Sequence, residues 1–335
     1  MDLEKIYQPI ADDLKAVEDS LASALSESKN RSILSMSEFL LEAPGKRMRP
    51  ALVILSEKAA SAGGKAAYDH RQLTEIATAM ELIHIASLIH DDVLDEAAMR
   101  HSRPTINARY GDDVSIVLGD YIYSKAFQLI GKCGNPDIFA CVSEAIHAMC
   151  EGELIHVCQR RNLDLSKDNY IVIVKKKTAS LFAACCHAGT IVGNHSRVVQ
   201  TALKEFGLNF GVAFQIVDDC RDVINEEGEL GKRPGQDMIT GDVTLPLLAL
   251  SDSVGPVERE EIKNMLGSAK DKDNLGRLRA MLLDSNALSK TVDVVSSYLA
   301  GARERLNTLA DSVYKESLVQ LVGQIAQKTP RDRTR

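Results

Sequence analysis

Two copies of the pattern Asp-Asp-x-x-Asp, at residues 91–95 and 218–222, are the residues of this chain best suited to chemistry. On a helix, side chains four residues apart share a face, so the first and third aspartates of each copy point the same way. Carboxylates packed this closely repel one another unless a cation lies between them. Oxygen ligands of this kind suit Mg²⁺, which keeps several of its own waters and bridges to phosphate oxygens. The two motifs therefore predict a diphosphate held by Mg²⁺ between two aspartate-rich helices.

Basic residues elsewhere could bind a second diphosphate. The segment 45–50, Gly-Lys-Arg-Met-Arg-Pro, opens a predicted helix whose N-terminus attracts anions, and Lys46 shares a face with Arg49. Arginine matches phosphate oxygens with paired donors, although a solvated basic patch is the alternative for this segment. Other basic candidates are Arg100, Lys177 and Lys232. Together with the aspartates they predict a site for two diphosphates, one bound through metal and one through cations.

The composition limits the class of protein and its partners. The 335 residues are 45% hydrophobic and 26% charged, as in ordinary soluble globular proteins, and no apolar run approaches the roughly 18 residues of a transmembrane helix. The net charge of −7 argues against a nucleic-acid partner. The seven cysteines include no Cys-x-x-Cys pair, so neither a zinc site nor a disulfide framework is indicated. The N-terminal segment does not resemble a signal peptide, and we expect a cytoplasmic protein.

Helical periodicity runs nearly from end to end, and no stretch predicts a β-sheet. We therefore expect one all-α domain, residues 1–335, of about a dozen helices. The predicted helix 72–98 is apolar nearly all round, which indicates a central position, and it carries the first aspartate motif at its end. The predicted helix 199–225 carries the second motif in the same way. Residues 225–244, with four glycines and a proline, are expected to form a mobile flap over the site, an ordinary surface loop being the alternative.

An ordered set of short segments resembles one enzyme family. These segments are GKRMRP at 45–50, ELIHIASLIHDDVLDEAAMR at 81–100, GDYIYSKAFQL at 119–129, EGEL at 151–154, KKTASLF at 176–182, FQIVDD at 214–219 and TLPLLAL at 244–250. On these residues the chain resembles the trans-isoprenyl diphosphate synthases, specifically the longer-chain all-trans polyprenyl diphosphate synthases such as octaprenyl diphosphate synthase, over nearly its whole length. The resemblance implies mostly antiparallel helices around a deep central cavity, usually in a homodimer. It also implies the substrates isopentenyl diphosphate and an allylic diphosphate.

The resemblance implies a role for each matching residue. The diphosphate of isopentenyl diphosphate is implied to bind Lys46, Arg49 and His84. The allylic diphosphate is implied to bind Arg100, Lys177, Thr178, Gln215 and Lys232. About three Mg²⁺ ions are implied, with Asp91 and Asp95 as ligands supported by Asp92, and with Asp218 as a ligand that has Asp219 and Asp222 nearby.

Two positions depart from the family pattern. The family usually has Arg-Arg-Gly after the first aspartate motif, whereas this chain has Arg-His-Ser at 100–102. The second Arg normally contributes to binding isopentenyl diphosphate, and His101, with an ordinary pKa near 6.5, is only partly cationic at neutral pH. We therefore expect weaker or pH-dependent binding of that substrate. The family also usually has Lys after Gly241, where this chain has Asp242, which puts closure of the flap over the diphosphate in question.

The chemistry that the family implies needs no nucleophilic side chain. Mg²⁺ neutralises charge on the leaving diphosphate, and the Thr178 hydroxyl, the Gln215 amide oxygen and backbone carbonyls stabilise the allylic cation. The double bond of isopentenyl diphosphate then attacks, and the released diphosphate is the expected base. The catalytic set is therefore Asp91, Asp95, Lys177, Thr178 and Gln215.

Product length is expected to depend on the cavity below Asp91. Ala86 and Ser87, five and four residues before Asp91, are small, whereas in the family a bulky aromatic here blocks the growing tail. Their sizes predict products longer than about fifteen carbons, although small residues also allow close helix packing.

Three other functions compete with a long-chain synthase. One is a farnesyl or geranylgeranyl diphosphate synthase, which has shorter products. Another is a non-catalytic subunit of a heteromeric synthase, but such subunits usually lose aspartates and this chain keeps all six. A terpene cyclase usually has an Asn/Asp-x-x-Ser/Thr-x-x-x-Glu motif where this chain has its second Asp-Asp-x-x-Asp.

Overall fold

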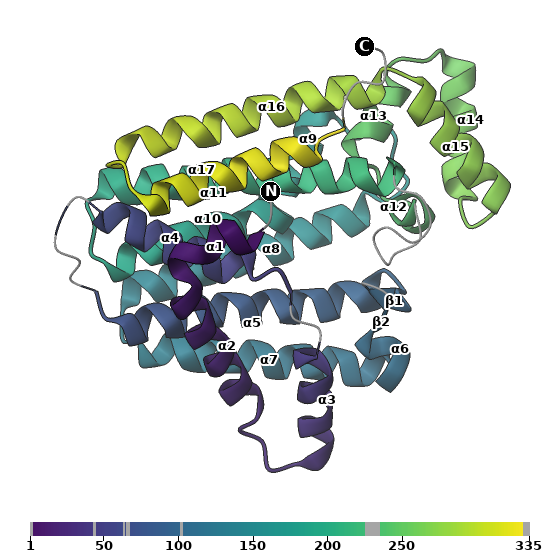
Figure 1. Cartoon of the computed structure of the whole chain (residues 1–335). Helices are drawn as coiled ribbons and strands as arrows, with labels where there is room; N and C mark the ends of the chain where they lie inside the picture. The colour runs from purple at the N-terminus through teal and green to yellow at the C-terminus, as the bar shows by residue number, and fades with distance from the viewer. Residues whose placement is uncertain are drawn as a thin grey trace. The chain divides into compact units, whose positions relative to one another are not determined.

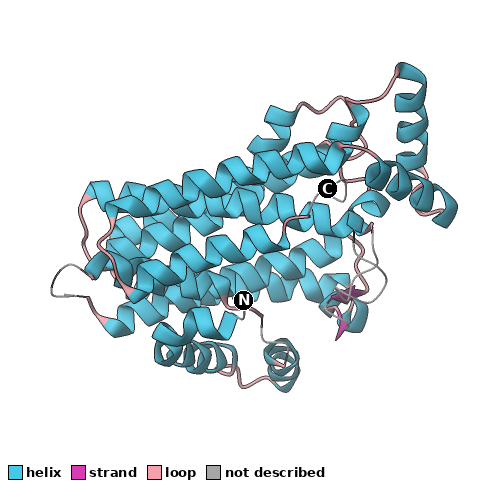
Figure 2. Cartoon of the chain, turned by 45° about the horizontal axis from the view of Figure 1, so that its top comes forward, coloured by secondary structure: helices cyan, strands magenta, loops and turns pink. Residues whose placement is uncertain are grey.

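Helices make up nearly all of the computed structural model, which describes residues 3–42, 45–62, 64, 68–100, 103–224 and 235–330. Figure 1 shows the helices, labelled α1 to α17, together with a short two-stranded ribbon, and Figure 2 shows the chain coloured by secondary structure. The predicted all-α fold is confirmed. Within the described part of the chain, no helix is both long enough and apolar enough to cross a membrane.

The chain divides into two compact units, each built from several stretches of sequence. The first comprises Met1–Glu144, Leu181–Gly207 and Arg305–Leu321, and the second comprises Ala145–Ser180, Leu208–Glu304 and Val322–Arg335. Helices α8 (Pro136–Cys158) and α11 (Arg197–Ile224) contribute residues to both units. The single domain of residues 1–335 and its central cavity therefore stay predictions.

The first unit contains the helix that carries the first aspartate motif. Besides the first parts of α8 and α11, its elements are α1 (Leu3–Tyr7), η1 (Gln8–Ile10), α2 (Ala11–Leu25), α3 (Arg31–Leu41), α4 (Met48–Ser61), α5 (His70–Leu94), β1 (Met99–Arg100), β2 (Arg103–Pro104), α6 (Ile106–Tyr110), α7 (Asp112–Lys132), most of α10 (Ser180–Val192), η3 (Leu306–Thr308) and the start of α17 (Val313–Lys328). Its core consists largely of aliphatic side chains from α2, α4, α5 and α10.

Helix α5 positions the first aspartate motif. Its N-terminus is capped by the side chain of Asp69, which accepts hydrogen bonds from the backbone N–H groups of Arg71 (2.8 Å) and Gln72 (3.4 Å). No glycine or proline interrupts its 25 residues, and its apolar side chains are buried on most sides, as the sequence predicted. It packs along α7 (Figure 1). Gly119 of α7 allows this close approach, because a Cβ atom there would lie 2.2 Å from Nε2 of His90.

The end of α5 differs from the expectation. The periodicity predicted a helix over 72–98, but α5 ends at Leu94, and Glu96 adopts a left-handed φ of 49°, a conformation that terminates helices. The chain then forms the antiparallel ribbon β1–β2, in which Arg100 pairs with Arg103. Strands of two residues leave no alternation for a sequence pattern to detect, so the ribbon was not predicted.

The second unit contains the second aspartate motif. Besides the later parts of α8, α11 and α17, its elements are α9 (Lys167–Val174), η2 (Lys175–Ala179), α12 (Gln236–Thr240), α13 (Leu245–Ser251), α14 (Pro256–Gly267), α15 (Lys272–Asp284) and most of α16 (Ala287–Arg305). The element η2 is a π-helical turn, a rare feature that occurs often at functional sites. Gly152 of α8 fits closely against it, since a Cβ atom there would lie 2.4 Å from the backbone N of Lys177.

The predicted flap is described only in part. Residues 225–234 lie outside the described residues, and from Gln236 the chain forms helix α12 rather than an irregular loop. The Asp222 carboxylate accepts hydrogen bonds from the backbone N–H groups of Gln236 (3.2 Å) and Asp237 (3.1 Å), so it caps the start of α12. The third aspartate of the second motif therefore anchors the part of the predicted flap that the structure describes.

Candidate active site

The first aspartate motif separates into one buried carboxylate and two more exposed ones. Asp92 is 6% exposed, and its Oδ1 lies 2.8 Å from both Nε and Nη2 of Arg100. Burial alone would lower the pKa of Arg100, but Asp92 and the other two aspartates raise it, so the guanidinium stays charged. Asp91 and Asp95 are half-buried. Asp92 therefore pairs with Arg100, and Asp91 and Asp95 are the candidate metal ligands of this motif.

Two polar residues at the start of α6 fix the backbone that presents this motif. Thr105 Oγ1 donates to the carbonyl oxygen of Ala97 (2.6 Å). The Asn107 side chain donates to the carbonyl oxygens of Ala97 (3.1 Å) and Asp92 (3.3 Å). Sequence reasoning missed both residues, because two polar side chains at the start of a five-residue helix have no distinctive spacing.

Arg49 and His84 have the surroundings expected of an anion site. The Arg49 guanidinium lies over the Phe182 ring, 4.7 Å from its centroid, and its buried Nε has no hydrogen-bond partner among the described residues. Buried donors are rarely left unpaired, so a bound anion would complete the hydrogen bonding here. Burial, followed by nearby arginines, holds the pKa of His84 well below its ordinary 6.5. The imidazole is therefore neutral and can still donate one hydrogen bond.

Arg47 fixes the segment that carries Lys46 and Arg49. Its guanidinium pairs with Glu18 (2.5 and 3.1 Å) and with the buried Glu81 (2.9 Å). Arg47 has a left-handed φ of 48° at the start of α4, a conformation that costs free energy in a residue other than glycine. The two carboxylates offset that cost, and Lys46 beside them is exposed. Arg47 was assigned no role from the sequence.

A chain of hydrogen bonds in the second unit joins the π-helical turn to the second aspartate motif. Thr178 Oγ1 donates to Gln215 Oε1 (2.9 Å), and Gln215 Nε2 donates to Asp219 Oδ1 (2.8 Å). Tyr170 donates from its hydroxyl to Asp219 Oδ2 (2.5 Å). Burial raises the pKa of Asp219 to about 6, although the two hydrogen bonds oppose the shift. Because both oxygens of Asp219 are engaged and Asp218 is exposed, Asp218 is the candidate metal ligand of this motif.

These bonds also orient two oxygens that could face a cation. Thr178 gives its hydroxyl proton to Gln215, so the lone pairs of its Oγ1 remain available. The Gln215 amide is held at both ends, by Thr178 at its oxygen and by Asp219 at its nitrogen, which fixes the direction of its dipole. Such preorganised dipoles stabilise charge that develops during a reaction.

Lys177 of the π-helical turn is held by two side chains of α8. Its Nζ lies 2.7 Å from Glu153 Oε2 and 3.0 Å from His156 Nδ1. Burial alone would raise the pKa of Glu153, but His156 and Lys177 lower it to about 2, so the carboxylate is ionised. Neither Glu153 nor His156 was among the predicted site residues. Their spacing of three residues on one helix, beside Gly152, was the signal that could have found them.

The two candidate chain-length residues differ in burial. Ala86 is fully buried, at 0% exposure. Ser87 is half-buried, and its hydroxyl donates to the carbonyl oxygen of His84 (2.9 Å). Ser87 lies one turn before Asp91 on the same face of α5. Accessible space therefore borders Ser87 and not Ala86.

The predicted chemistry does not require a preformed site in which protein side chains alone hold the metal ion. Among the described residues, no group of three His, Cys, Asp or Glu side chains is assembled to hold a metal ion. This fits Mg²⁺, which proteins usually bind through one or two carboxylates, with waters and substrate phosphate oxygens completing the shell.

Two predicted substrate-binding residues, His101 and Lys232, lie outside the described residues.

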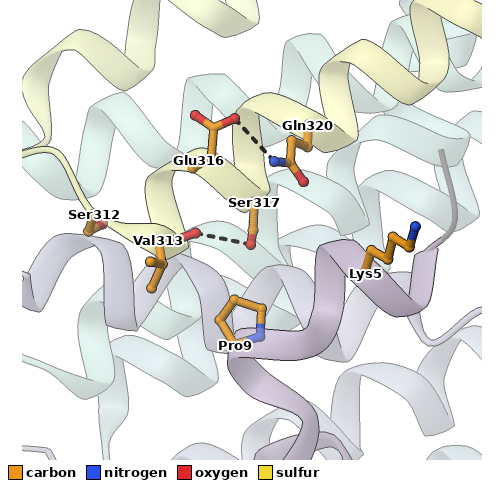
Figure 3. A pocket seen from close by; sticks show the side chains of 7 residues that line it. All are labelled: Lys5, Pro9, Ser312, Val313, Glu316, Ser317 and Gln320. Atoms are coloured by element: carbon orange, nitrogen blue, oxygen red, sulfur yellow. Dashed lines mark hydrogen bonds between the residues drawn. The ribbon is translucent and has the colours of Figure 1, made fainter.

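A pocket of about 360 Å³ in the first unit involves none of the predicted site residues. Figure 3 shows its lining, which comes from α1, η1, the residue before α17 and the first half of α17: Lys5, Pro9, Ser312, Val313, Glu316, Ser317 and Gln320. Ser317 Oγ donates to the carbonyl oxygen of Ile6 (2.8 Å), and Gln320 Nε2 donates to Glu316 Oε1 (3.1 Å). These polar groups are engaged in hydrogen bonds within the protein, and the pocket gives no argument for substrate binding.

Each aspartate motif lies at or near the C-terminal end of a long helix, and each unit also contains a basic side chain paired with a carboxylate, Arg100 in the first and Lys177 in the second. The chain belongs to the polyprenyl synthetase family, whose model matches residues 30–282. It is 30% identical over 328 residues to octaprenyl diphosphate synthase of Escherichia coli (strain K12), covering 98% of this chain and 99% of that protein. It is 33% identical over 304 residues to heptaprenyl diphosphate synthase component 2 of Geobacillus stearothermophilus, covering 90% of each.

A solved structure agrees with this assignment. The polyprenyl synthase from Caulobacter crescentus CB15, complexed with calcium and isoprenyl diphosphate, matches with a TM-score of 0.91 and 28% identity, over 99% of this chain and 98% of that one. The predicted family and the predicted activity, all-trans polyprenyl diphosphate synthesis by a trans-prenyltransferase, are thereby confirmed. The calcium ion in that relative is consistent with dependence on a divalent metal. The metal's identity, the homodimer, the location in the cell and the role of each site residue stay predictions.

Proposed function

We propose that this chain uses Mg²⁺ to condense isopentenyl diphosphate with an allylic diphosphate, giving an all-trans polyprenyl diphosphate longer than about fifteen carbons. The observation that carries the proposal is the hydrogen-bonded chain from Thr178 through Gln215 to Asp219, which orients two oxygens beside the second aspartate motif. The small side chains of Ala86 and Ser87 support the product length. Relatives named as octaprenyl and decaprenyl diphosphate synthases support it too.

Each diphosphate has its own set of residues in this proposal. Asp91 and Asp95 of the first unit and Asp218 of the second would hold Mg²⁺, which would supply positive charge to offset the charge on the leaving diphosphate. Arg100 and Lys177 bind the same diphosphate, and their paired carboxylates keep them charged and oriented. Lys232 is proposed to contribute to the same set.

The other diphosphate belongs to isopentenyl diphosphate. Arg49 offers it the unpaired Nε, neutral His84 offers a ring N–H, and exposed Lys46 adds a charge. His101 is proposed to complete this set. The double bond of this substrate attacks the allylic carbon as its C–O bond breaks, and Thr178 Oγ1 and Gln215 Oε1 stabilise the positive charge. The departing diphosphate accepts the proton that is then lost, so no side chain is needed as the base.

A homodimer in the cytoplasm is part of the proposal. Exposed apolar side chains on α7 and the start of α8 support a partner at this surface: Ile116 (46%), Val117 (67%), Phe127 (38%) and Phe139 (53%). The alternative is a heteromeric enzyme, which the name of the Geobacillus relative, component 2, favours. Light scattering of the purified chain distinguishes a monomer from a dimer. Turnover by the purified chain alone distinguishes the homodimer from the heteromeric enzyme.

Turnover by the purified chain tests the function. With isopentenyl diphosphate and farnesyl diphosphate, the chain alone should release diphosphate in Mg²⁺, stop in EDTA and recover when Mg²⁺ is restored. Equal activity in EDTA would refute the metal mechanism. Activity that appears only after a second polypeptide is added would refute the homodimer and support the heteromeric alternative.

A further inference from the structure

Asp242, the second departure from the family pattern, lies among charged side chains of the second unit. It is 7% exposed, and its Oδ1 lies 2.8 Å from Arg160 Nε and 3.4 Å from His156 Nε2. Its Oδ2 accepts a hydrogen bond from Thr240 Oγ1 (2.9 Å). Both carboxylate oxygens are therefore engaged, and the charge is balanced by a cation in direct contact.

The backbone around Asp242 is also fixed. Its N–H donates to the carbonyl oxygen of Asp237 (2.7 Å) in the turn that ends α12, where Gly241 has a left-handed φ of 88°. A Cβ atom on Gly241 would lie 2.8 Å from Cγ of Arg161, whose N–H donates to the carbonyl oxygen of Gly241 (2.7 Å). The turn thus packs closely on the segment after α8. This packing keeps the Asp242 carboxylate next to Arg160.

His156 links Asp242 to Lys177. Its Nε2 faces Asp242 Oδ1, and its Nδ1 lies 3.0 Å from Lys177 Nζ. With the ring proton on Nε2, the imidazole faces the carboxylate with a donor and accepts from Lys177 at Nδ1. Glu153 contacts the same ammonium group at 2.7 Å. Glu153 and His156 therefore both hold Lys177, and His156 itself faces Asp242.

Residue 242 has the opposite charge in this chain from the one that is usual in the family. The family usually has Lys here, and replacing it with Asp changes the local charge by two units. An unpaired carboxylate would repel a diphosphate, yet this carboxylate is buried against Arg160. A lysine at position 242 of this chain would instead face Arg160 and the Nε2 side of His156, and like charges in a buried place repel strongly.

We propose that Asp242 is a positioning residue that holds Arg160 directly and Lys177 through His156, and that this acid–arginine pair replaces the lysine of the family. The inference rests on the proposed function, in which Lys177 binds the allylic diphosphate. Its consequence is that the family's own residue does not suit this chain. Asp242→Lys impairs the enzyme, and a matching change at Arg160 restores part of the loss.

Steady-state kinetics of four variants test the proposal. Asp242→Asn keeps the shape and removes the charge, so it should raise the KM for the allylic diphosphate about tenfold and change the KM for isopentenyl diphosphate less than twofold. Asp242→Lys should raise the allylic KM further. Adding Arg160→Asp to Asp242→Lys should recover at least about threefold, because the pair is re-formed with its charges exchanged, although His156 loses its acceptor. Arg160→Asp alone should be as impaired as Asp242→Lys.

Asp164 provides the matched control in the same unit. It pairs with Arg259 at 2.9 Å, but its side chain is 85% exposed. Asp164→Lys should therefore leave both KM values within about twofold of wild type. Melting temperatures of all variants show whether each one folds.

Three results would overturn the proposal. One is an Asp242→Lys variant as active as wild type. Another is an Asp242→Asn variant with an unchanged allylic KM, or with both KM values raised in step with a lower melting temperature, which is the pattern of a purely structural residue. A double variant no better than Asp242→Lys, although folded, would also contradict it. If wild type itself does not turn over, the proposed function fails together with this inference, whereas normal wild-type turnover with unaffected variants removes the inference alone.

Discussion

Substituting phenylalanine at the two candidate chain-length positions should separate product control from packing. Ser87 lies about 6 Å along α5 from Asp91, because the helix rises 1.5 Å per residue. It is half-buried, so a ring there can enter accessible space instead of the packed core. We expect Ser87→Phe to fill room that the growing chain needs and to shorten the main product to about fifteen to twenty carbons. The first condensations should stay fast, since the metal and phosphate ligands are untouched.

Ala86→Phe should also shorten the product, but at a cost to stability. Ala86 is fully buried, so a ring there must displace packed neighbours, which costs about 1–3 kcal/mol in the free energy of unfolding. Ser87→Phe gives up one local hydrogen bond, worth about 1 kcal/mol at most because water can replace it at a half-buried site. Urea unfolding monitored by circular dichroism should therefore show a larger loss for Ala86→Phe than for Ser87→Phe.

The assay is reversed-phase chromatography of the products after phosphatase treatment. Wild type should give products longer than fifteen carbons, and Ser87→Phe should give a shorter ladder at a similar initial rate. Wild-type products from both variants would show that the growing chain does not follow this face of α5. A wild-type product of fifteen carbons would refute the long-chain assignment itself.

Three further predictions concern the ligands of the two diphosphates. Asp91→Ala should reduce turnover by about 10³-fold or more with the fold intact, because a metal-liganding carboxylate supports several kcal/mol of transition-state stabilisation, and turnover within tenfold of wild type would contradict its role. His101→Arg should lower the KM for isopentenyl diphosphate and flatten its rise with pH while leaving the allylic KM nearly unchanged; an unaltered KM would place His101 outside the site. Burial and nearby arginines hold the pKa of His84 below 6.5, so the unfolded chain takes up the proton first as pH falls and the stability present above about pH 6.5 is lost below it. His84→Asn should therefore lose less stability than wild type between pH 7.5 and pH 5.5 in urea unfolding, and an equal loss in both proteins would refute the shift.

The sequence was sufficient for most of the long helices and for the position of each aspartate motif, but it did not predict the short helices α6 and α12. Long helical periodicity with acidic residues at the polar end predicted α5 and α11, and both are present with their motifs at or near their C-terminal ends. It predicted the end of α5 too late, because apolar periodicity continued past Leu94 while the left-handed Glu96 turned the chain. Periodicity reports which face is apolar and does not report backbone conformation at one residue.

Spacing alone could not predict which aspartate of each motif pairs with another side chain and which is the candidate metal ligand. Asp92 is distinguished from Asp91 by Arg100, which the β1–β2 ribbon brings back to it, and no sequence signal marked that ribbon. Asp219 is distinguished from Asp218 by the hydroxyl of Tyr170, which lies 49 residues earlier in the chain. Contacts between distant segments follow from tertiary packing, whereas a four-residue spacing on one helix follows from local geometry.

Product analysis of the purified chain tests the central claim most directly. The protein is incubated alone with farnesyl diphosphate and isopentenyl diphosphate, in Mg²⁺ or in EDTA, and the dephosphorylated products are sized against all-trans polyprenol standards. The account predicts products that grow in five-carbon steps beyond fifteen carbons in Mg²⁺ and none in EDTA. Unextended farnesyl diphosphate in Mg²⁺, or a cyclised hydrocarbon in place of a longer diphosphate, would contradict it.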